Sequence, residues 1–260
     1  MPFHEQNGIR YYSFDIFSSS IEQAVFTRRG GVSPAPWASL NVGGTVGDDK
    51  ANVVENRIRS FNVVGRKPAS IFDVWLVHST EVICADAPRL LDTLPIRADS
   101  ILTDKPNVTL YMRYADCVPL LFHDPKKGVV GIAHAGWMGT VHGIAKATIE
   151  KMRSRYGCKP ENILAAIGPS IGPDHYEIGS DVVVKVQESF GMDADRLLEP
   201  RNGRMYLDLW MANYIQMRNI GLERIEVSGV CTACHLDDWF SYRAEKGKTG
   251  RFGALIGLQA

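Results

Sequence analysis

The sequence predicts a mixed α/β protein, in which helices pack on mixed β-sheets. Short β-prone runs are interspersed with stretches whose apolar residues recur at helical spacing. Two apolar runs, at 118–122 and 129–133, flank the turn segment Asp124-Pro125-Lys126-Lys127-Gly128, which predicts a β-hairpin with a five-residue connection. A hairpin does not belong to a pure βαβ series, so antiparallel pairs are expected as well. Because no linker, repeat or low-complexity segment is present, we expect one domain spanning residues 1–260.

The first helix is predicted most sharply. Asp48 or Asp49 is expected to cap it, and its apolar residues recur on one face from about Lys50 to Val63. The other expected helices cover residues 139–156, 180–190 and 207–220, and the expected strands cover 9–15, 23–27, 71–77, 81–85, 100–103, 109–114, 163–167, 226–230 and 252–257.

Composition narrows the class of partner. The 260 residues include 29 basic and 29 acidic side chains, so the formal net charge is zero. This balance argues against a protein that coats nucleic acid or an anionic membrane. The N-terminus has no basic segment followed by an apolar one, and no apolar run is long enough to span a membrane. The odd number of cysteines, five, then predicts reduced thiols in the cytoplasm instead of a disulfide framework.

Cys117 and His134 flank the predicted hairpin turn almost symmetrically. We therefore expect them to lie opposite each other on one face, with Cβ atoms roughly 4.5–5.5 Å apart. A thiolate and an imidazole at that separation can share a metal ion, form a Cys–His nucleophile pair, or be a buried thiol beside a hydrogen-bonded histidine. His123 is excluded from this site because it lies roughly 20 Å along the strand from Cys117.

His78 is the third candidate ligand. It is expected to end an apolar strand, where functional side chains often lie. By itself it could equally be a structural histidine. Together with Cys117 and His134 it would make a His₂Cys set, and three ligands leave one tetrahedral position open, as in catalytic zinc sites.

Two further motifs carry possible chemistry. Arg28 and Arg29, next to Gly30 and Gly31, could form an anion site or an exposed turn. The segment Cys231-Thr-Ala-Cys234-His235 spells a haem-attachment pattern, but covalent haem belongs to exported chains. A metal pair, a redox pair or two buried thiols are the alternatives for these cysteines, and the sequence leaves their role open.

These motifs, in this order, resemble the YfiH-like family, also called the laccase-domain, multicopper polyphenol oxidase or purine nucleoside phosphorylase family. The resemblance covers nearly the whole chain. It rests on TRRGGVS at 27–33, SLN at 39–41, VGDD at 46–49, VH at 77–78, ADCVP at 115–119, HAGW at 134–137, GPSI at 168–171, YEIG at 176–179, CT at 231–232 and FSYR at 240–243.

The resemblance implies a four-layer α-β-β-α sandwich and one zinc ion held by His78, Cys117 and His134. It also implies phosphorolysis of adenosine, inosine and methylthioadenosine, with adenosine deamination as a side activity. Copper is the alternative metal, because a His₂Cys set also suits it. The expected partners are a purine nucleoside and phosphate, and the chain is expected to be a monomer. Leu76, Ser79 and Thr45 depart from the family pattern, and these changes concern substrate preference instead of the metal ligands.

Four residues are candidates for binding substrate. Arg28 is expected to hold phosphate and stabilise charge in the transition state. The others are Asn41, Glu177 and Arg243.

Other functions remain open at the level of sequence. A multicopper laccase conflicts with the composition, because the chain has seven histidines and no His-x-His pair. A single-copper polyphenol oxidase is compatible with the ligand set. A Cys–His hydrolase acting in peptidoglycan precursor editing would use Cys117 as nucleophile and His134 as base. The non-enzymatic alternative is a binding protein stabilised by zinc.

Overall fold

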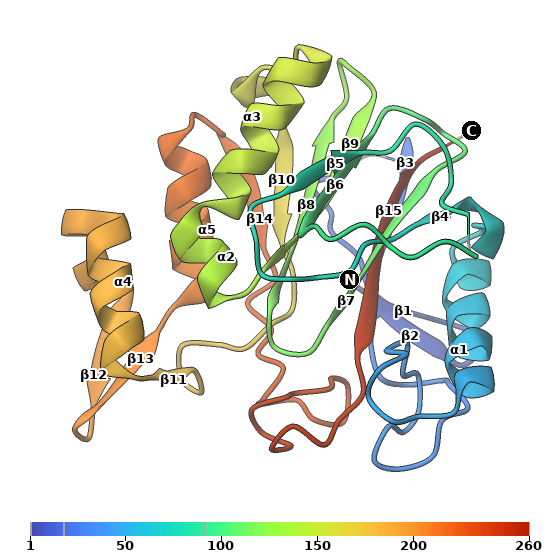
Figure 1. Cartoon of the computed structure of the whole chain (residues 1–260), viewed down its shortest axis with the longest axis horizontal. Helices are drawn as coiled ribbons and strands as arrows, with labels where there is room; N and C mark the ends of the chain where they lie inside the picture. Colours follow the sequence, from blue (N-terminus) through green and yellow to red (C-terminus); the bar gives the residue numbers. More distant parts are fainter. Residues whose placement is uncertain (1, 18, 91, 260) are drawn as a thin grey trace.

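The computed structural model describes residues 2–17, 19–90 and 92–259, and its centre is a pair of six-stranded sheets (Figure 1). In the first sheet β4 runs parallel to β7, and the remaining pairs are antiparallel. Its order is β1 (Phe3–Gln6), β2 (Ile9–Tyr12), β3 (Ile21–Phe26), β15 (Phe252–Leu258), β7 (Thr109–Tyr114) and β4 (Ile71–Phe72).

The second sheet is also mixed, which confirms the predicted class. Its two end pairs, β14 with β10 and β6 with β5, are parallel, and the three pairs between them are antiparallel. Its order is β14 (Arg224–Val227), β10 (Leu164–Ile167), β8 (Val118–Asp124), β9 (Val129–Ala135), β6 (Ser100–Thr103) and β5 (Val82–Cys84).

Within the described residues, five α-helices lie on the outer faces of the sheets and beside them. Figure 1 shows α1 on one side of the strands and α2, α3 and α5 on the other, with α4 and a small third sheet beyond. The helices are α1 (Lys50–Val63), α2 (Trp137–His142), α3 (Ile144–Tyr156), α4 (Ser180–Phe190) and α5 (Leu209–Asn219). The third sheet comprises β11 (Glu177–Ile178), β13 (Arg204–Leu207) and β12 (Leu198–Arg201). Short 3₁₀ turns cover Pro68–Ser70, Pro160–Asn162 and Gly191–Arg196.

Three buried clusters show that the layers form an α-β-β-α sandwich, as predicted. One cluster joins the facing sides of the sheets, for example Met112 of β7 with Ile132 of β9. A second packs Phe61 of α1 on the outer side of the first sheet. The third packs α3 and α5 on the outer side of the second sheet, with Ile149 and Ile215 among its members. Burial of these apolar faces fixes which side of each strand remains available for function.

The helix predictions were correct for α1 and wrong in detail for the next one. Asp49 caps α1, and its carboxylate accepts a hydrogen bond of 2.8 Å from the backbone N–H of Ala51. The predicted helix at 139–156 is two helices. It starts earlier, at Trp137, and Gly143 interrupts it with a left-handed φ of 84°. Glycine adopts this conformation without steric strain, so the chain changes direction there.

The central hairpin was predicted, but its register was not. β8 and β9 form the hairpin, and the Asp124 carboxylate accepts backbone N–H bonds from Lys126 and Lys127 in the turn. Pro119 pairs with His134, so Cys117 lies two residues away from the predicted position opposite His134. Because side chains alternate along a strand, this shift of two residues keeps both groups on the same face.

Some strands differ from the predictions. The strand expected at 71–77 ends at Phe72, because the segment that follows forms loop structure around the cavity described below. The hairpins β1–β2 and β12–β13 were missed, although each turns at an Asn-Gly pair with positive φ at both residues. Asn-Gly is a strong signal for a two-residue hairpin turn. No helix in residues 2–17, 19–90 and 92–259 has the length and apolar character needed to cross a membrane.

Candidate metal centre

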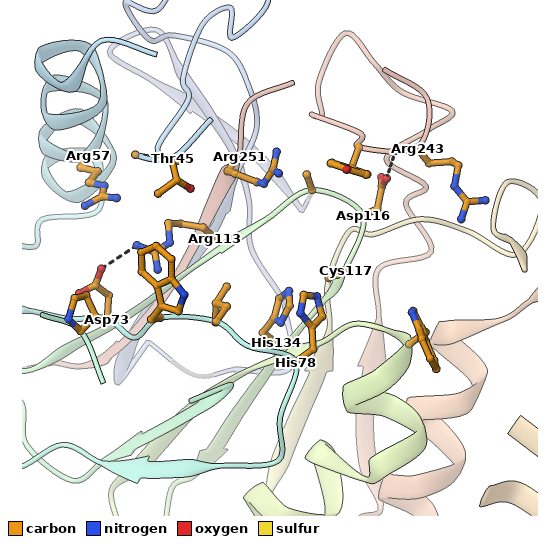
Figure 2. Close-up of a pocket in the computed structure, with 18 of the residues that line it drawn as sticks. Thr45, Arg57, Asp73, His78, Arg113, Asp116, Cys117, His134, Arg243 and Arg251 are labelled. Atoms are coloured by element: carbon orange, nitrogen blue, oxygen red, sulfur yellow. Dashed lines mark hydrogen bonds and ion pairs between the residues drawn. The ribbon is translucent and has the colours of Figure 1, made fainter. Parts of the chain in front are cut away.

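Three potential ligands converge from separate parts of the chain at one end of the stacked sheets. His78 lies in the loop between β4 and β5, Cys117 directly precedes β8, and His134 lies in β9. One ligand atom from each residue lies within 4.8 Å of the other two (Figure 2). His78 does not end a strand as predicted. It has a left-handed φ of 59°, and this loop conformation places its ring 5.0 Å from the ring of His134.

A buried carboxylate supports the cluster from behind. Asp99 Oδ1 accepts a hydrogen bond of 3.0 Å from His134 Nδ1, which leaves Nε2 available as the ligand atom. Asp99 Oδ2 accepts bonds from the backbone N–H of Val77 and from both the backbone N–H and the hydroxyl of Ser79. The same side chain therefore orients one ligand directly and holds the residues on either side of His78. This carboxylate–histidine arrangement is typical of metal sites.

Gly136 leaves room for the cluster. A Cβ atom added at this position would lie 3.0 Å from Cys117 Sγ and 3.0 Å from His78 Cδ2. Such contacts are shorter than normal van der Waals distances, so a larger residue would displace both ligands. The HAGW segment at 134–137 thus contributes a ligand and, two residues later, the space that the other two ligands need.

The side chains of the cluster also shift one another's pKa values. Burial raises the pKa of the Cys117 thiol, but the neighbouring His134 and His78 outweigh this effect and lower the pKa to about 6. Burial lowers the pKa of His134, but the Cys117 thiolate and Asp99 outweigh it and raise the pKa to about 9. For Asp99, hydrogen bonds from His134 and Ser79 overcome the effect of burial and lower the pKa to about 2. Without a metal, these shifts favour a Cys117 thiolate beside a protonated His134 at neutral pH, and metal binding would release the proton from the ligating nitrogen.

The donor set fits a single zinc or copper ion. One thiolate sulfur and two imidazole nitrogens suit either metal. Tetrahedral zinc, with bonds of about 2.0 Å to nitrogen and 2.3 Å to sulfur, holds its ligand atoms roughly 3–4 Å apart. The three side chains already lie within 4.8 Å of one another, so small rotations would complete the set.

The cluster opens into a cavity of about 710 Å³. Its lining includes five arginines and two aspartates, which gives it an excess of positive charge. Asp73 offsets part of this charge, since it forms ion pairs with Arg89 at 2.7 Å and with Arg113 at 3.0 Å. In Figure 2, Thr45 lies between Arg57 and Arg251, all three of which line the cavity. Exposed aromatic side chains complete the wall, including Trp75 and Tyr242.

Of the four predicted substrate residues, only Arg243 is among those that line this cavity. Its guanidinium lies 5.0 Å over the ring of Tyr176 and donates a hydrogen bond of 2.7 Å to the carbonyl of Glu177. The carboxylate of Glu177 is paired at 2.8 Å with Arg204. Glu177 therefore meets Arg243 through its backbone.

Asn41 and Arg28 bond to other protein groups and are not among the residues that line the cavity. Asn41 is fully buried, and its Oδ1 accepts backbone N–H bonds from Gly43 and Arg251, both of which line the cavity. Arg28 forms an ion pair of 3.1 Å with Glu245 and lies 4.4 Å over the ring of Phe240, away from the cavity lining.

Apart from Arg243, the sequence assigned none of the arginines that line the cavity to substrate binding. Arg57 belongs to α1, and its guanidinium donates two hydrogen bonds to the carbonyl of Val42 at the cavity edge. Arg113 lies inside a strand whose neighbouring residues are buried. A charge in such a strand was the available signal, because buried charges need partners or a function.

The chain resembles known proteins along nearly its full length. The family model described as multi-copper polyphenol oxidoreductase laccase matches residues 22–259. A protein of Deinococcus radiodurans named purine nucleoside phosphorylase is 40% identical over 239 residues, covering 92% of this chain and 90% of that one. Purine nucleoside phosphorylase YlmD of Bacillus subtilis is 36% identical over 242 residues, covering 90% and 87%.

Solved structures match equally well. The crystal structure of YlmD from Geobacillus stearothermophilus has a TM-score of 0.93 at 32% identity, over 100% of this chain and 99% of that one. The crystal structure of the Bacillus licheniformis hypothetical protein YfiH has a TM-score of 0.92 at 32% identity and covers 99% of both chains.

Proposed function

The chain belongs to the multi-copper polyphenol oxidoreductase laccase family, and from this premise we propose that it is a metal-dependent purine nucleoside phosphorylase. The substrates proposed are adenosine, inosine and methylthioadenosine, with adenosine deamination as a side activity. One observation carries the proposal. A His₂Cys ligand set opens into a 710 Å³ cavity whose lining has five arginines against two aspartates, and relatives bear the name of this activity.

The arginines suit the anionic substrate. In phosphorolysis a phosphate oxygen bonds to C1′ of the ribose while the bond from C1′ to the purine nitrogen breaks. Arg57, Arg113 and Arg251 line the cavity and supply guanidinium groups that can hold phosphate beside C1′. Their positive charge also stabilises phosphate as it approaches, because the interaction takes place in a partly buried site.

The aromatic residues suit the nucleoside. Trp75 and Tyr242 line the cavity and are 50% and 55% exposed, so both offer aromatic surface for stacking against a purine, although Arg251 already lies 5.6 Å over the ring of Tyr242. Asp116 also lines the cavity, but its carboxylate accepts bonds of 2.7 Å from Thr232 and from the backbone of Arg243. These bonds assign Asp116 to positioning Arg243.

His78, Cys117 and His134 would hold the metal, and Asp99 would fix the orientation of His134. Zinc, when bound, supplies Lewis acidity at the cavity wall. Copper is the alternative ion for the same ligands.

The test is incubation of the zinc-loaded protein with adenosine and phosphate. Ribose 1-phosphate and adenine are the expected products. Inosine without ribose 1-phosphate would reduce the proposal to deamination. The absence of both products from a fully metal-loaded sample would contradict the proposal. Oxygen uptake by a copper-loaded sample with a phenol would instead support the oxidase named by the family model.

A matched pair of variants tests the phosphate-binding arginines. Replacement of Arg251 by Gln is expected to raise KM for phosphate by about 10- to 100-fold, because a hydrogen bond to a charged group contributes about 1.5–3 kcal/mol. Arg204→Gln removes an exposed arginine outside the cavity lining and is the control, with KM expected to be unchanged. An equal effect of the two substitutions would contradict the assignment of Arg251.

A Cys–His hydrolase is the second candidate, and a separate observation favours it. The neighbouring His134 lowers the pKa of Cys117 to about 6, and His134 bonds to Asp99 at 3.0 Å. In a hydrolase, Cys117 would be the nucleophile, His134 the base and Asp99 the group that orients the base. Metal content separates the candidates. A hydrolase would act without metal and would be inhibited by zinc, whereas the phosphorylase should lose activity when a chelator removes zinc.

A further inference from the structure

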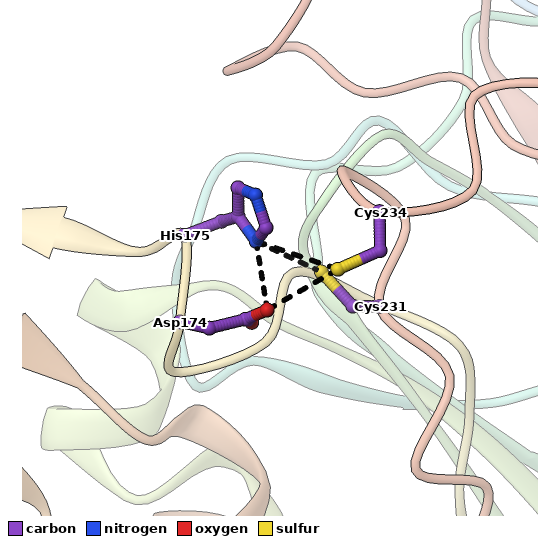
Figure 3. Close-up of side chains that lie close together, drawn as sticks. All are labelled: Asp174, His175, Cys231 and Cys234. Atoms are coloured by element: carbon purple, nitrogen blue, oxygen red, sulfur yellow. Dashed lines mark hydrogen bonds and ion pairs between the residues drawn. The ribbon is translucent and has the colours of Figure 1, made fainter.

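A second group of potential ligands lies outside the cavity lining, in two neighbouring loops (Figure 3). Asp174 and His175 follow β10, and Cys231 and Cys234 follow β14. One ligand atom from each of the four side chains lies within 4.8 Å of the other three. His175 Nδ1 is 3.8 Å from Cys231 Sγ, 3.5 Å from Cys234 Sγ and 3.0 Å from Asp174 Oδ2.

The topology of the second sheet brings these loops together. β10 and β14 are parallel neighbours, so both chains leave the sheet at the same edge. The two loops remain paired beyond the strands through a bridge between Ser170 and Cys231, and Thr232 donates its backbone N–H to the carbonyl of Ser170 at 3.0 Å. The four side chains are thus presented by backbone that is held by hydrogen bonds.

We propose that Asp174, His175, Cys231 and Cys234 bind a second metal ion, and that this ion is a structural zinc. Two thiolates, one imidazole and one carboxylate are established zinc ligands, and four protein ligands complete a tetrahedral site. The backbone N–H of Gly172 points at Cys231 Sγ at 3.2 Å, a bond that would stabilise a metal-bound thiolate.

A disulfide is the competing use of a Cys-x-x-Cys pair, and the surroundings favour the metal. A disulfide needs only the two sulfur atoms, but here a histidine nitrogen and a carboxylate oxygen also approach Cys234, the oxygen of Asp174 at 3.2 Å. Both cysteines are free thiols. His235, the histidine of the Cys-x-x-Cys-His motif, does not belong to the group, and the histidine that does is His175 from the other loop. Cys234 is exposed, so the alternative of two buried thiols is wrong for it.

The second site would stabilise one wall of the cavity. Thr232 lies between the two cysteines, and its hydroxyl donates a bond of 2.7 Å to Asp116, the neighbour of Cys117. Tyr176 follows His175 directly and lines the cavity. An ion that joins the two loops therefore restrains a residue next to the first metal centre and an aromatic side chain of the substrate cavity, without itself touching substrate.

The proposal is tested by measuring zinc in the reduced full-length protein after saturation with zinc alone and removal of excess. About two equivalents are expected for the unmodified chain, and about one after Cys234→Ser or His175→Asn, because each removes a ligand from the four-ligand group. His78→Ala should also leave about one equivalent, held by the other group. Cys84→Ser changes a cysteine that belongs to neither group and is the matched control.

Cobalt substitution identifies which site is filled. Thiolate-to-cobalt absorption should persist in His78→Ala, where two thiolates remain in the four-ligand group, and should fall in Cys234→Ser. Circular dichroism establishes that each variant is folded, and Cys234 and His175 are exposed, so their replacement should leave the fold intact. Zinc should also raise the melting temperature of His78→Ala but not that of His78→Ala combined with Cys234→Ser.

Two results would overturn the proposal. One is a single equivalent of zinc in the unmodified chain that persists in folded Cys234→Ser and disappears in His78→Ala. The other is a Cys231–Cys234 disulfide, detected by mass spectrometry as two thiols that resist alkylation until strong reduction. Neither result depends on which reaction the cavity catalyses, so this test is independent of the proposed function.

Discussion

The two clusters of candidate ligands use similar side chains in different settings, and the difference is the one expected between a reactive metal centre and a structural one. In the first cluster, His134 and its partner Asp99 have side chains that are 6% and 0% exposed, and three ligands face a cavity. In the second, His175 and Asp174 are 44% and 48% exposed, and four ligands lie in surface loops. An incomplete ligand set at a cavity leaves room for substrate, whereas a complete set provides only a cross-link.

The role of the carboxylate differs in the same way. Asp99 stands behind the first cluster and bonds to His134, Val77 and Ser79, so it positions ligands without being one. Asp174 lies among the ligand atoms of its own cluster. Hydrogen bonds of Asp99 therefore hold the first cluster without a metal, whereas we expect the exposed side chains of the second to gain more of their order from the ion.

Replacement of one cysteine in each cluster should give the largest contrast. Cys117→Ser removes a metal ligand and is expected to lower the rate of phosphorolysis by at least about 100-fold. Mutation of residues that only support the ligands already reduces metal affinity or activity by about 10- to 100-fold. Cys234→Ser should retain most of the activity at low temperature and lose it earlier on heating. Initial rates against temperature measure both effects. Equal losses at all temperatures would contradict the division into reactive and structural sites.

Asp99→Asn should have the next largest effect. The amide keeps the size of the side chain but loses the negative charge that holds the proton of His134. Zinc affinity of the first cluster, measured by competition with a chelator, is expected to fall by about 10- to 100-fold, with affinity at the second cluster unchanged. Asp86→Asn, at an exposed carboxylate, is the control. If affinity falls only at the second cluster, the assignment of Asp99 is wrong.

The sequence predicted well the features that depend on residues close together in the chain. It predicted less well the features that depend on how the layers stack. The hairpin signal predicted that Cys117 and His134 share one face, the family resemblance added His78, and the mixture of patterns predicted the fold class; the structure brings the three side chains together. The strand register could not be predicted, because the turn length sets it and a shift of two residues preserves the apolar pattern. The Asn-Gly signals at Asn7 and Asn202 were present and were overlooked.

Contacts between distant segments explain the rest. The Cys231–Cys234 pair was visible as a motif, but its partners Asp174 and His175 lie in another loop, and only the parallel pairing of β10 with β14 makes them neighbours. Arg57 reaches the cavity because α1 packs on the outer side of the first sheet, near the loop that contains Val42. Periodicity predicts that a helix has an apolar face but does not identify the sheet that covers it.

Gly136→Ala should give a smaller effect that again distinguishes the clusters. The added methyl group would lie 3.0 Å from both Cys117 Sγ and His78 Cδ2, so the ligands must shift by a few tenths of an ångström. We expect about a tenfold loss of zinc affinity at the first cluster, at the lower end of the range for indirect changes, and none at the second. Gly128→Ala has open space around the added Cβ, but its left-handed φ of 61° strains alanine, so it controls for a loss of stability at a site away from the cluster. Unchanged affinity in Gly136→Ala would show that the ligands adjust freely.

The smallest effect is a difference in thiol ionisation between the metal-free clusters. The pKa of Cys117 is about 6, so it should be a thiolate above that pH, and His134, with a pKa of about 9, should keep its proton up to that value. Burial and the neighbouring Asp174 and Cys231 raise the pKa of Cys234 to about 12, so it should remain a thiol throughout.

Thiolate absorbance of the chelator-treated protein should therefore rise through pH 6. That rise should vanish in Cys117→Ser, persist in Cys234→Ser and move to higher pH in His134→Gln, where the stabilising positive charge is gone. A rise through pH 6 that survives in Cys117→Ser would assign the reactive thiolate to another cysteine and remove the distinction between the two clusters.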